Sequence, residues 1–154
     1  MIVSTAGPAD LPGFLALAAQ VEHWFGPMVG DPGFAEAVSR NVERGTALCV
    51  RREDSARLRA GMLHSCRPGT CRITWLVVDG ADRGCGVGRA LVSALVCRVV
   101  DADDLEVITF AGGQPAAGPS GARAFYERLG FTAAEAAPEG PDGAPRQWLR
   151  RRLR

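Results

Sequence analysis

A glycine-rich turn between two apolar segments is the part of this chain best suited to chemistry. The apolar run Ile73–Val78 is followed by a turn that contains Gly84, Gly86 and Gly88. Apolar residues then recur with helical spacing over Val87–Val99. Backbone N–H groups at a helix start attract anions, and glycine lets a phosphate approach closely. The pattern therefore predicts a strand, an anion-binding turn and a helix.

Other interpretations of this turn are weaker or less specific. A P-loop ends in Gly-Lys-Ser/Thr, whereas the 18 basic residues of this chain are all arginine. A dinucleotide-binding fingerprint needs Gly-x-Gly-x-x-Gly, and the third glycine here comes one residue early. A purely structural interpretation remains, in which the glycines let a helix pack closely against a strand.

Two motifs together resemble a known family. The spacing Arg83-x-x-Gly86-x-Gly88 is similar to the pyrophosphate loop of the GNAT superfamily of N-acetyltransferases, Gln/Arg-x-x-Gly-x-Gly/Ala after an apolar strand. About forty residues further on, Ala122–Phe131 resembles the second signature of that family, Ala-x-x-Leu/Phe-Tyr-x-x-x-Gly-Phe. One departure is Pro119, which stands where many members have asparagine. The resemblance covers about residues 1–135.

The resemblance implies acetyl-CoA as the acyl donor. The backbone of Leu76, Val77 and Val78 is then expected to pair with the pantetheine amides like an added strand. The pyrophosphate is expected at the N–H groups of the turn and helix start, with charge-assisted contacts from the two arginines. The residues expected there are Arg83, Gly84, Cys85, Gly86, Val87, Gly88 and Arg89.

Transfer of an acetyl group from a thioester to an amine requires a proton for the departing sulfur and a base for the amine. In the family context Tyr126 faces the sulfur, so it is the candidate acid. Glu22 and His23 are the first candidates for the base, because they fall where the family has an acceptor loop. His64 and Glu106 are alternatives, and for each of these residues a structural role stays open.

The order of predicted elements indicates an α+β fold in one domain over 1–154. The resemblance makes this a GNAT-like mixed, mostly antiparallel sheet with a V-shaped splay between its two central strands, flanked by helices. Strands are expected over 1–5, 46–52, 57–65, 73–78, 106–110 and 147–152. Helices are expected to start near Asp10, Asp31, Val87 and Ala122.

Composition limits the partners. The net charge is +1, with no basic tract typical of nucleic-acid binding, and the arginines at 150–152 and 154 are expected to be a solvated strand end. Neither a signal peptide nor an apolar run of membrane-spanning length is found, which favours a cytoplasmic protein without a membrane partner. Five cysteines without Cys-x-x-Cys spacing and only two histidines predict no metal site. Cys49 and Cys97 are expected to be small core residues.

Two functions follow from the resemblance. The first is transfer of an acetyl group from acetyl-CoA to a primary amine of a small molecule or peptide by direct attack. The alternative is a catalytically weak acyl-CoA-binding regulatory or assembly module with the same fold. The identity of the amine is beyond the sequence, and a homodimer stays open.

Overall fold

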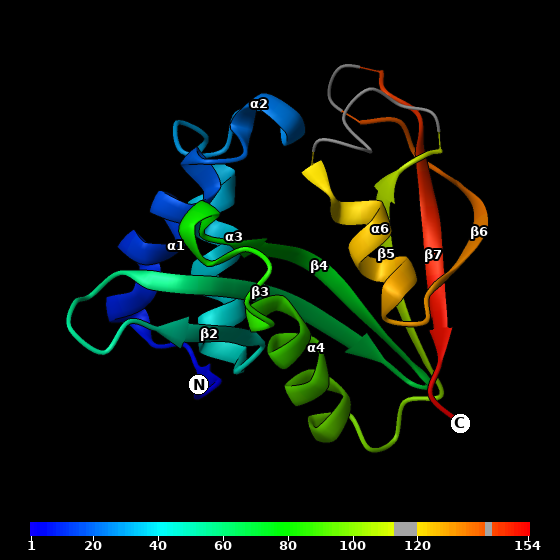
Figure 1. Ribbon diagram of the computed structural model, residues 1–154, viewed down its shortest axis with the longest axis horizontal. Coiled ribbons are helices and arrows are strands. Elements are labelled where there is room, and N and C mark those ends of the chain that lie inside the picture. Colours follow the sequence, from blue (N-terminus) through cyan, green and yellow to red (C-terminus); the bar gives the residue numbers. More distant parts are fainter. Residues whose placement is uncertain (113–119, 141–142) are drawn as a thin grey trace.

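A seven-stranded mixed sheet forms the centre of the protein. The computed structural model describes residues 1–112, 120–140 and 143–154. The strand order is β1-β2-β3-β4-β5-β7-β6, and every neighbouring pair is antiparallel except β4–β5, so the expected α+β class is confirmed (Figure 1). The strands are β1 Ser4–Thr5, β2 Ala47–Arg51, β3 Leu58–Arg67, β4 Thr70–Val78, β5 Asp104–Phe110, β6 Thr132–Ala137 and β7 Arg146–Arg152.

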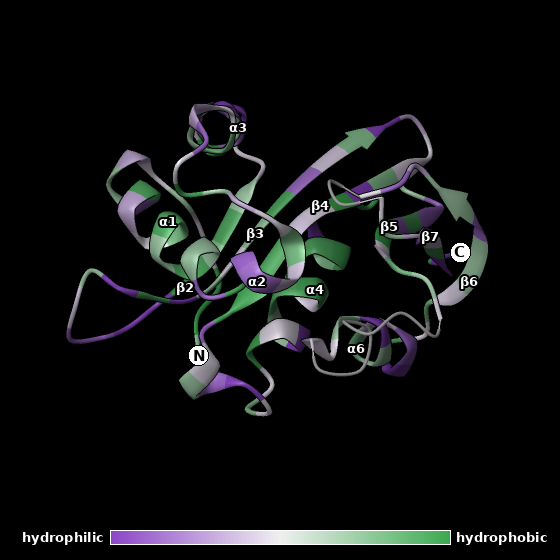
Figure 2. Ribbon diagram, turned by 90° about the horizontal axis from the view of Figure 1, so that it is seen from above, coloured by the Kyte–Doolittle hydropathy of each residue, from purple (hydrophilic) through white to green (hydrophobic). Residues whose placement is uncertain are grey.

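Helices cover both faces of the sheet (Figure 2). Helices α1 and α3 pack on one face around buried Phe14 and Val38, and α4 and α6 pack on the other around buried Leu91 and Leu95. None of the helices in the described part of the chain has the length and apolar composition needed to cross a membrane. The helices are α1 Leu11–Ala19, α2 Glu22–Phe25, α3 Pro32–Arg44, α4 Val87–Arg98 and α6 Ala122–Arg128, with short 3-10 turns η1 Pro8–Asp10 and η2 Gly80–Asp82.

Local signals set the ends of these helices as expected. The Asp31 carboxylate accepts a hydrogen bond of 2.9 Å from the Gly33 N–H, which caps the start of α3. Gly45 ends α3 in the left-handed region, at φ +72°. Gly130 does the same beyond α6, at φ +91°.

Some sequence expectations were wrong. The strand β6 was missed, because Thr-Ala-Ala-Glu-Ala-Ala has low β propensity and becomes a strand only by pairing with β7. The first strand is limited to Ser4–Thr5, and the expected break after α1 contains the short helix α2. Arg150 was expected to be part of a solvated strand end, but its guanidinium forms ion pairs with Glu106 and Glu135.

The loop residues 113–119, Pro119 among them, lie outside the described part, as do 141–142.

The two central strands diverge along their length. Strand β4 pairs with β5 only from Thr70↔Asp104 to Ile73↔Val107. Beyond these pairs, the second half of β4 continues alongside β3 while β5 continues alongside β7. The sheet therefore opens into a V between β4 and β5 (Figure 1).

Candidate functional site

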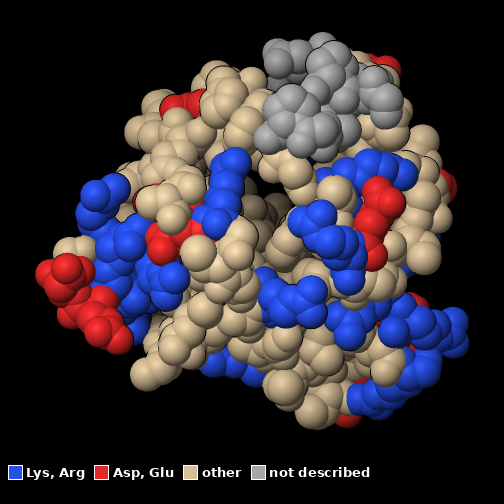
Figure 3. Space-filling model, in the orientation of Figure 1, with Lys and Arg blue, Asp and Glu red and all other residues tan. Residues whose placement is uncertain are grey.

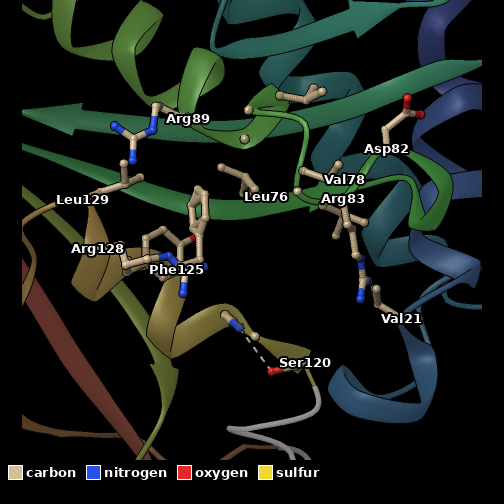
Figure 4. Close-up of a pocket in the computed structure, with 18 of the residues that line it drawn as sticks. Val21, Leu76, Val78, Asp82, Arg83, Arg89, Ser120, Phe125, Arg128 and Leu129 are labelled. Atoms are coloured by element: carbon tan, nitrogen blue, oxygen red, sulfur yellow. Dashed lines mark hydrogen bonds between the residues drawn. The ribbon is translucent and has the colours of Figure 1, made fainter.

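A cavity of about 480 Å³ lies at the open end of the V. Its walls come from the end of β4, the turn before α4, and the helices α2 and α6 (Figure 4). Leu76, Val77 and Val78 line it from the strand. No described strand pairs with that edge of β4 beyond Ile73. The peptide groups on this edge therefore have no partner strand on the side of the cavity. An extended ligand could pair with this edge as an added strand.

The turn before α4 has a backbone that depends on glycine. Gly84 and Gly86 have φ values of +76° and +81°, which other residues rarely adopt, and Gly86 immediately precedes the first residue of α4. No side-chain atom lies within 4 Å of where a Cβ of Gly86 would stand. Gly86, Val87, Gly88 and Arg89 line the cavity, and the first N–H groups of a helix have no partner within the helix, which suits an anion.

A close contact joins the two sequence motifs. A Cβ on Gly88 would lie 2.9 Å from Cε1 of Phe125, so α6 packs against the first turn of α4 where only glycine leaves room. Phe125 in turn meets Tyr126 edge-on, with ring centroids 5.0 Å apart. The contact joins the glycine turn to the helix that carries Phe125 and Tyr126.

An ion-pair network holds the turn from behind. The Asp82 carboxylate pairs with the guanidinium groups of Arg52 and Arg59, which come from β3 and the loop before it. The neighbouring Asp79 accepts hydrogen bonds from the Ala81 N–H at 2.9 Å and from the Gln20 amide at 3.1 Å. Both carboxylates are buried, so the turn is fixed to the sheet and to the end of α1.

Arginine side chains surround the cavity mouth. Blue side chains gather around the central hollow in the space-filling view (Figure 3). Arg89 and Arg128 lie on one side of the cavity and Arg83 on the other (Figure 4). The Arg83 guanidinium lies 5.0 Å from the centre of the Trp24 ring. Within the described residues these arginines form no ion pair with a protein carboxylate, so their charge is available to an anionic ligand.

Comparison with known proteins gives this site a family context. Residues 34–133 match the model of the acetyltransferase (GNAT) domain, which is more than half of the chain. This protein belongs to the GNAT acetyltransferase family. Comparison with curated proteins finds no matching sequence.

Solved GNAT structures share the whole fold. Ard1 from Thermoplasma volcanium is 17% identical with a TM-score of 0.76, and the match covers 98% of this chain and 96% of that one. The ribosomal-protein-alanine N-acetyltransferase from Brucella melitensis is 19% identical with a TM-score of 0.74, covering 99% of both chains. An aminoglycoside 6'-N-acetyltransferase complexed with coenzyme A is 17% identical with a TM-score of 0.69, covering 100% and 98%.

Tyr126 of this GNAT protein lies in the cavity wall. Its side chain is 6% exposed and meets Phe131 edge-on at 5.3 Å between centroids. Burial raises the pKa of its hydroxyl above the ordinary value near 10, so the phenol stays protonated at neutral pH. Nearly all the other residues expected at the donor site also line the cavity. The exception is Cys85, which is exposed and does not line the cavity.

Glu22 and His23 lie near the cavity without lining it. The Glu22 carboxylate accepts a hydrogen bond of 2.7 Å from the Met28 N–H and thereby holds the loop after α2. The His23 ring is exposed and lies 4.1 Å from the Trp24 ring, between centroids. It is Trp24 and Phe25 of the same short helix that face the cavity.

The alternative base candidates lie elsewhere. His64 is buried on β3, where desolvation, reinforced by the positive charge of Arg98, lowers its pKa. Glu106 is 2% exposed on β5, and although its burial opposes ionisation, hydrogen bonds led by that of Arg72 lower its pKa. Neither residue reaches the cavity.

Sequence reasoning missed Arg128. It follows Tyr126 by two positions, and its side chain reaches the cavity from the end of α6. The sequence places a cation in the last turn of that helix, but only the packing of α6 on Gly88 brings it near the glycine turn. Among the described residues that line the cavity, Asp82 is the one with a carboxylate. That carboxylate already forms ion pairs with Arg52 and Arg59.

Proposed function

We propose that this GNAT protein transfers the acetyl group of acetyl-CoA to a primary amine of a small molecule or peptide by direct attack. The observation that carries the proposal is the cavity in the V between β4 and β5, bounded by a free strand edge and by a glycine turn at a helix start. A strand edge suits the amides of pantetheine, and the turn suits a pyrophosphate.

The donor site divides into two parts. The backbone of Leu76, Val77 and Val78 holds the pantetheine arm. The N–H groups from Arg83 to Arg89 hold the pyrophosphate, with Gly84, Cys85, Gly86, Val87 and Gly88 between them. Arg89 and Arg128 line the same side of the cavity and add charge-assisted hydrogen bonds to the phosphates. The structures of relatives complexed with coenzyme A support this assignment by analogy of fold.

Tyr126 donates a hydrogen bond, and later a proton, to the departing sulfur. As the amine attacks the thioester carbonyl, negative charge passes to the oxygen and then to the sulfur as the carbon–sulfur bond breaks. A buried phenol that keeps its proton can donate a hydrogen bond to that sulfur and release the proton late in bond breaking. The backbone N–H near Val78 is the donor that we assign to the carbonyl oxygen.

The acceptor side is built from α2. Trp24 and Phe25 provide an apolar wall, and Phe25 stacks on Phe110 of β5 at 5.2 Å between centroids. This wall favours an amine on an aromatic or aliphatic body over a polycation. We propose that His23, exposed beside Trp24, takes the amine proton through water. Glu22 positions the wall through its hydrogen bond to Met28.

The test is release of free thiol from acetyl-CoA in the presence of an amine panel that includes peptide N-termini, aminoglycosides and small aromatic amines. We expect saturable thiol release with at least one amine and mass-spectrometric detection of the N-acetylated product. Binding of acetyl-CoA without turnover across the panel would favour the regulatory or assembly module. Failure to bind acetyl-CoA at all would overturn both functions.

A further inference from the structure

A second cluster of reactive side chains lies at the opposite end of β4. His64 and Cys66 come from β3 and Cys71 from β4. One ring nitrogen of the histidine and the two sulfur atoms all lie within 4.8 Å of one another. Cys71 precedes Val78 by seven positions, so along the strand the cluster is about 23 Å from the donor site. It is therefore no part of that cavity.

The hairpin between β3 and β4 fixes this arrangement. Gly69 has a φ of +83°, and the Pro68–Gly69 turn pairs Arg67 with Thr70. The next pair along the ladder is Cys66 with Cys71, whose Cα atoms are 4.1 Å apart, and the structure joins them by a disulfide. His64 precedes Cys66 by two residues and therefore shares its face of the strand.

His64 is the unexplained member of the cluster. Its side chain is 7% exposed, and neither ring nitrogen has a hydrogen-bond partner among the described residues. Burying an imidazole without a partner costs free energy, so such a group usually has a ligand or another role. A cavity of about 280 Å³, lined by Cys66 and Cys71 and by the end of α4, gives access to the sulfur atoms.

We propose that the chain with Cys66 and Cys71 reduced binds one Zn²⁺ through the two thiolates and the His64 imidazole. Nitrogen and thiolate ligands select zinc over magnesium or calcium, which prefer oxygen. Two thiolates balance the charge of the ion. With these ligands from the protein, the fourth tetrahedral position falls to a water molecule from the adjoining cavity.

The disulfide and the metal site exclude each other, because Cys66 and Cys71 have no thiolate to bind a metal while their sulfur atoms are joined. Reduction by a phosphine consumes one water molecule, converts the phosphine to its oxide and leaves two thiols. Zinc binding then releases two protons, one from each thiol. The disulfide alone leaves His64 without a partner, whereas the metal uses one of its ring nitrogens.

The test is titration of the full chain with Zn²⁺ under anaerobic conditions, after phosphine reduction and removal of metals by a chelator. We expect calorimetry to give one Zn²⁺ per chain and a higher melting temperature on binding. Cobalt(II) in place of zinc should give sulfur-to-cobalt charge-transfer bands and the visible bands of a tetrahedral site. The oxidised protein should show none of these effects.

Variants separate ligation from folding. Cys66 is exposed, so Cys66→Ser should fold normally and lose stoichiometric binding. His64→Leu replaces an unpartnered buried imidazole by an apolar side chain, so the metal-free protein should be no less stable while zinc binding is lost. Cys97 is exposed on α4 and is not the core residue that the sequence predicted, so Cys97→Ser is the matched control and should bind as the wild type does. Absence of one-to-one binding by the reduced wild type, or full binding by Cys66→Ser and His64→Leu, would overturn the proposal.

Discussion

The burial of Tyr126 decides what its hydroxyl can do. A free phenol has a pKa within about two units of that of an alkyl thiol. The free energy of proton transfer from the phenol to the thiolate is therefore small. Desolvation raises the pKa of Tyr126, which makes the phenol a weaker acid than a free one. We therefore propose that the residue acts as a hydrogen-bond donor to the developing thiolate and that the proton follows late.

Tyr126→Phe should fold normally and bind acetyl-CoA with unchanged affinity, because the ring contacts with Phe125 and Phe131 remain. We expect turnover to fall by roughly 10²-fold, the low end of general-acid effects. Steady-state kinetics and calorimetric titration measure the two quantities separately. A fall of less than about threefold would mean that water protonates the sulfur. Lost affinity would instead point to a hydrogen bond that holds the sulfur in place.

His23→Gln should lower turnover and leave the affinity for acetyl-CoA intact, because the imidazole lies beside Trp24, in the wall that we assign to the amine. Turnover at saturating acetyl-CoA and a calorimetric titration with acetyl-CoA check these two expectations. An unchanged rate would assign His23 a role in packing against Trp24.

Glu22 can be tested with a matched pair of variants. Glu22→Gln keeps an oxygen that can accept from the Met28 N–H, whereas Glu22→Ala removes it. We expect Glu22→Ala to raise the KM for the amine and Glu22→Gln to leave it near the wild-type value. A rate lost equally in both variants would show that the carboxylate acts on the acceptor proton itself.

At the scale of elements, the start of α4 depends on its contacts with three other elements. η2 is held through Asp82 by the arginines of the β2–β3 hairpin, and α6 packs on Gly88 through Phe125. These contacts hold the first turn of α4 in the wall of the cavity. We therefore expect the affinity for acetyl-CoA to depend on the whole turn, so that a backbone change there weakens binding while the packing of Tyr126 stays intact.

Gly86→Val places a branched side chain at φ +81° and in the open space that we assign to a phosphate. We expect acetyl-CoA binding to be largely lost in a calorimetric or thermal-shift titration. Gly45→Val is a control for backbone strain alone, because Gly45 has a φ of +72° at the end of α3 and no atom lies within 4 Å of where its Cβ would stand. It should lower the melting temperature and leave the affinity unchanged. Unchanged affinity in Gly86→Val would contradict the proposed phosphate site.

At the scale of the whole molecule, a buried carboxylate lies at the base of the V. Glu106 of β5 accepts hydrogen bonds from guanidinium groups that come from the β3 end, β4 and β7: Arg67 at 3.1 Å, Arg72 at 2.9 Å and Arg150 at 3.3 Å. The ion-pair cluster ties together the strands on both sides of the splay where they still pair. The open end is thus free to hold a ligand while the base is fixed.

Glu106→Gln should destabilise the fold at pH 7 by about 1.5–3 kcal/mol, the range for hydrogen bonds to charged groups. Hydrogen bonds from the arginines lower the pKa of Glu106 against the effect of burial, so the charged form stabilises the fold above its unfolded pKa near 4.5. This stabilisation is lost as the pH falls below that value. Urea denaturation should therefore show a difference between wild type and variant that shrinks towards acidic pH.

Glu135→Gln is the control, since Glu135 pairs with the same Arg150 at an exposed position. It should leave stability unchanged within error. An equal loss in both variants, or a loss in Glu106→Gln that does not depend on pH, would contradict the assignment.

The sequence by itself determined the turn at 83–89, the helix that carries Tyr126 and the helix ends at Asp31 and Gly45. These features depend on residues a few positions apart, through caps, positive φ and helical spacing, so they are local properties. Only the tertiary structure decided which side chains meet across long stretches of chain. The arginines on Glu106, the hydrogen bond from Met28 to Glu22 and the cluster of His64 with two cysteines all depend on strand register and loop closure. Strand β6 belongs with them, because its alanines form a strand only against β7.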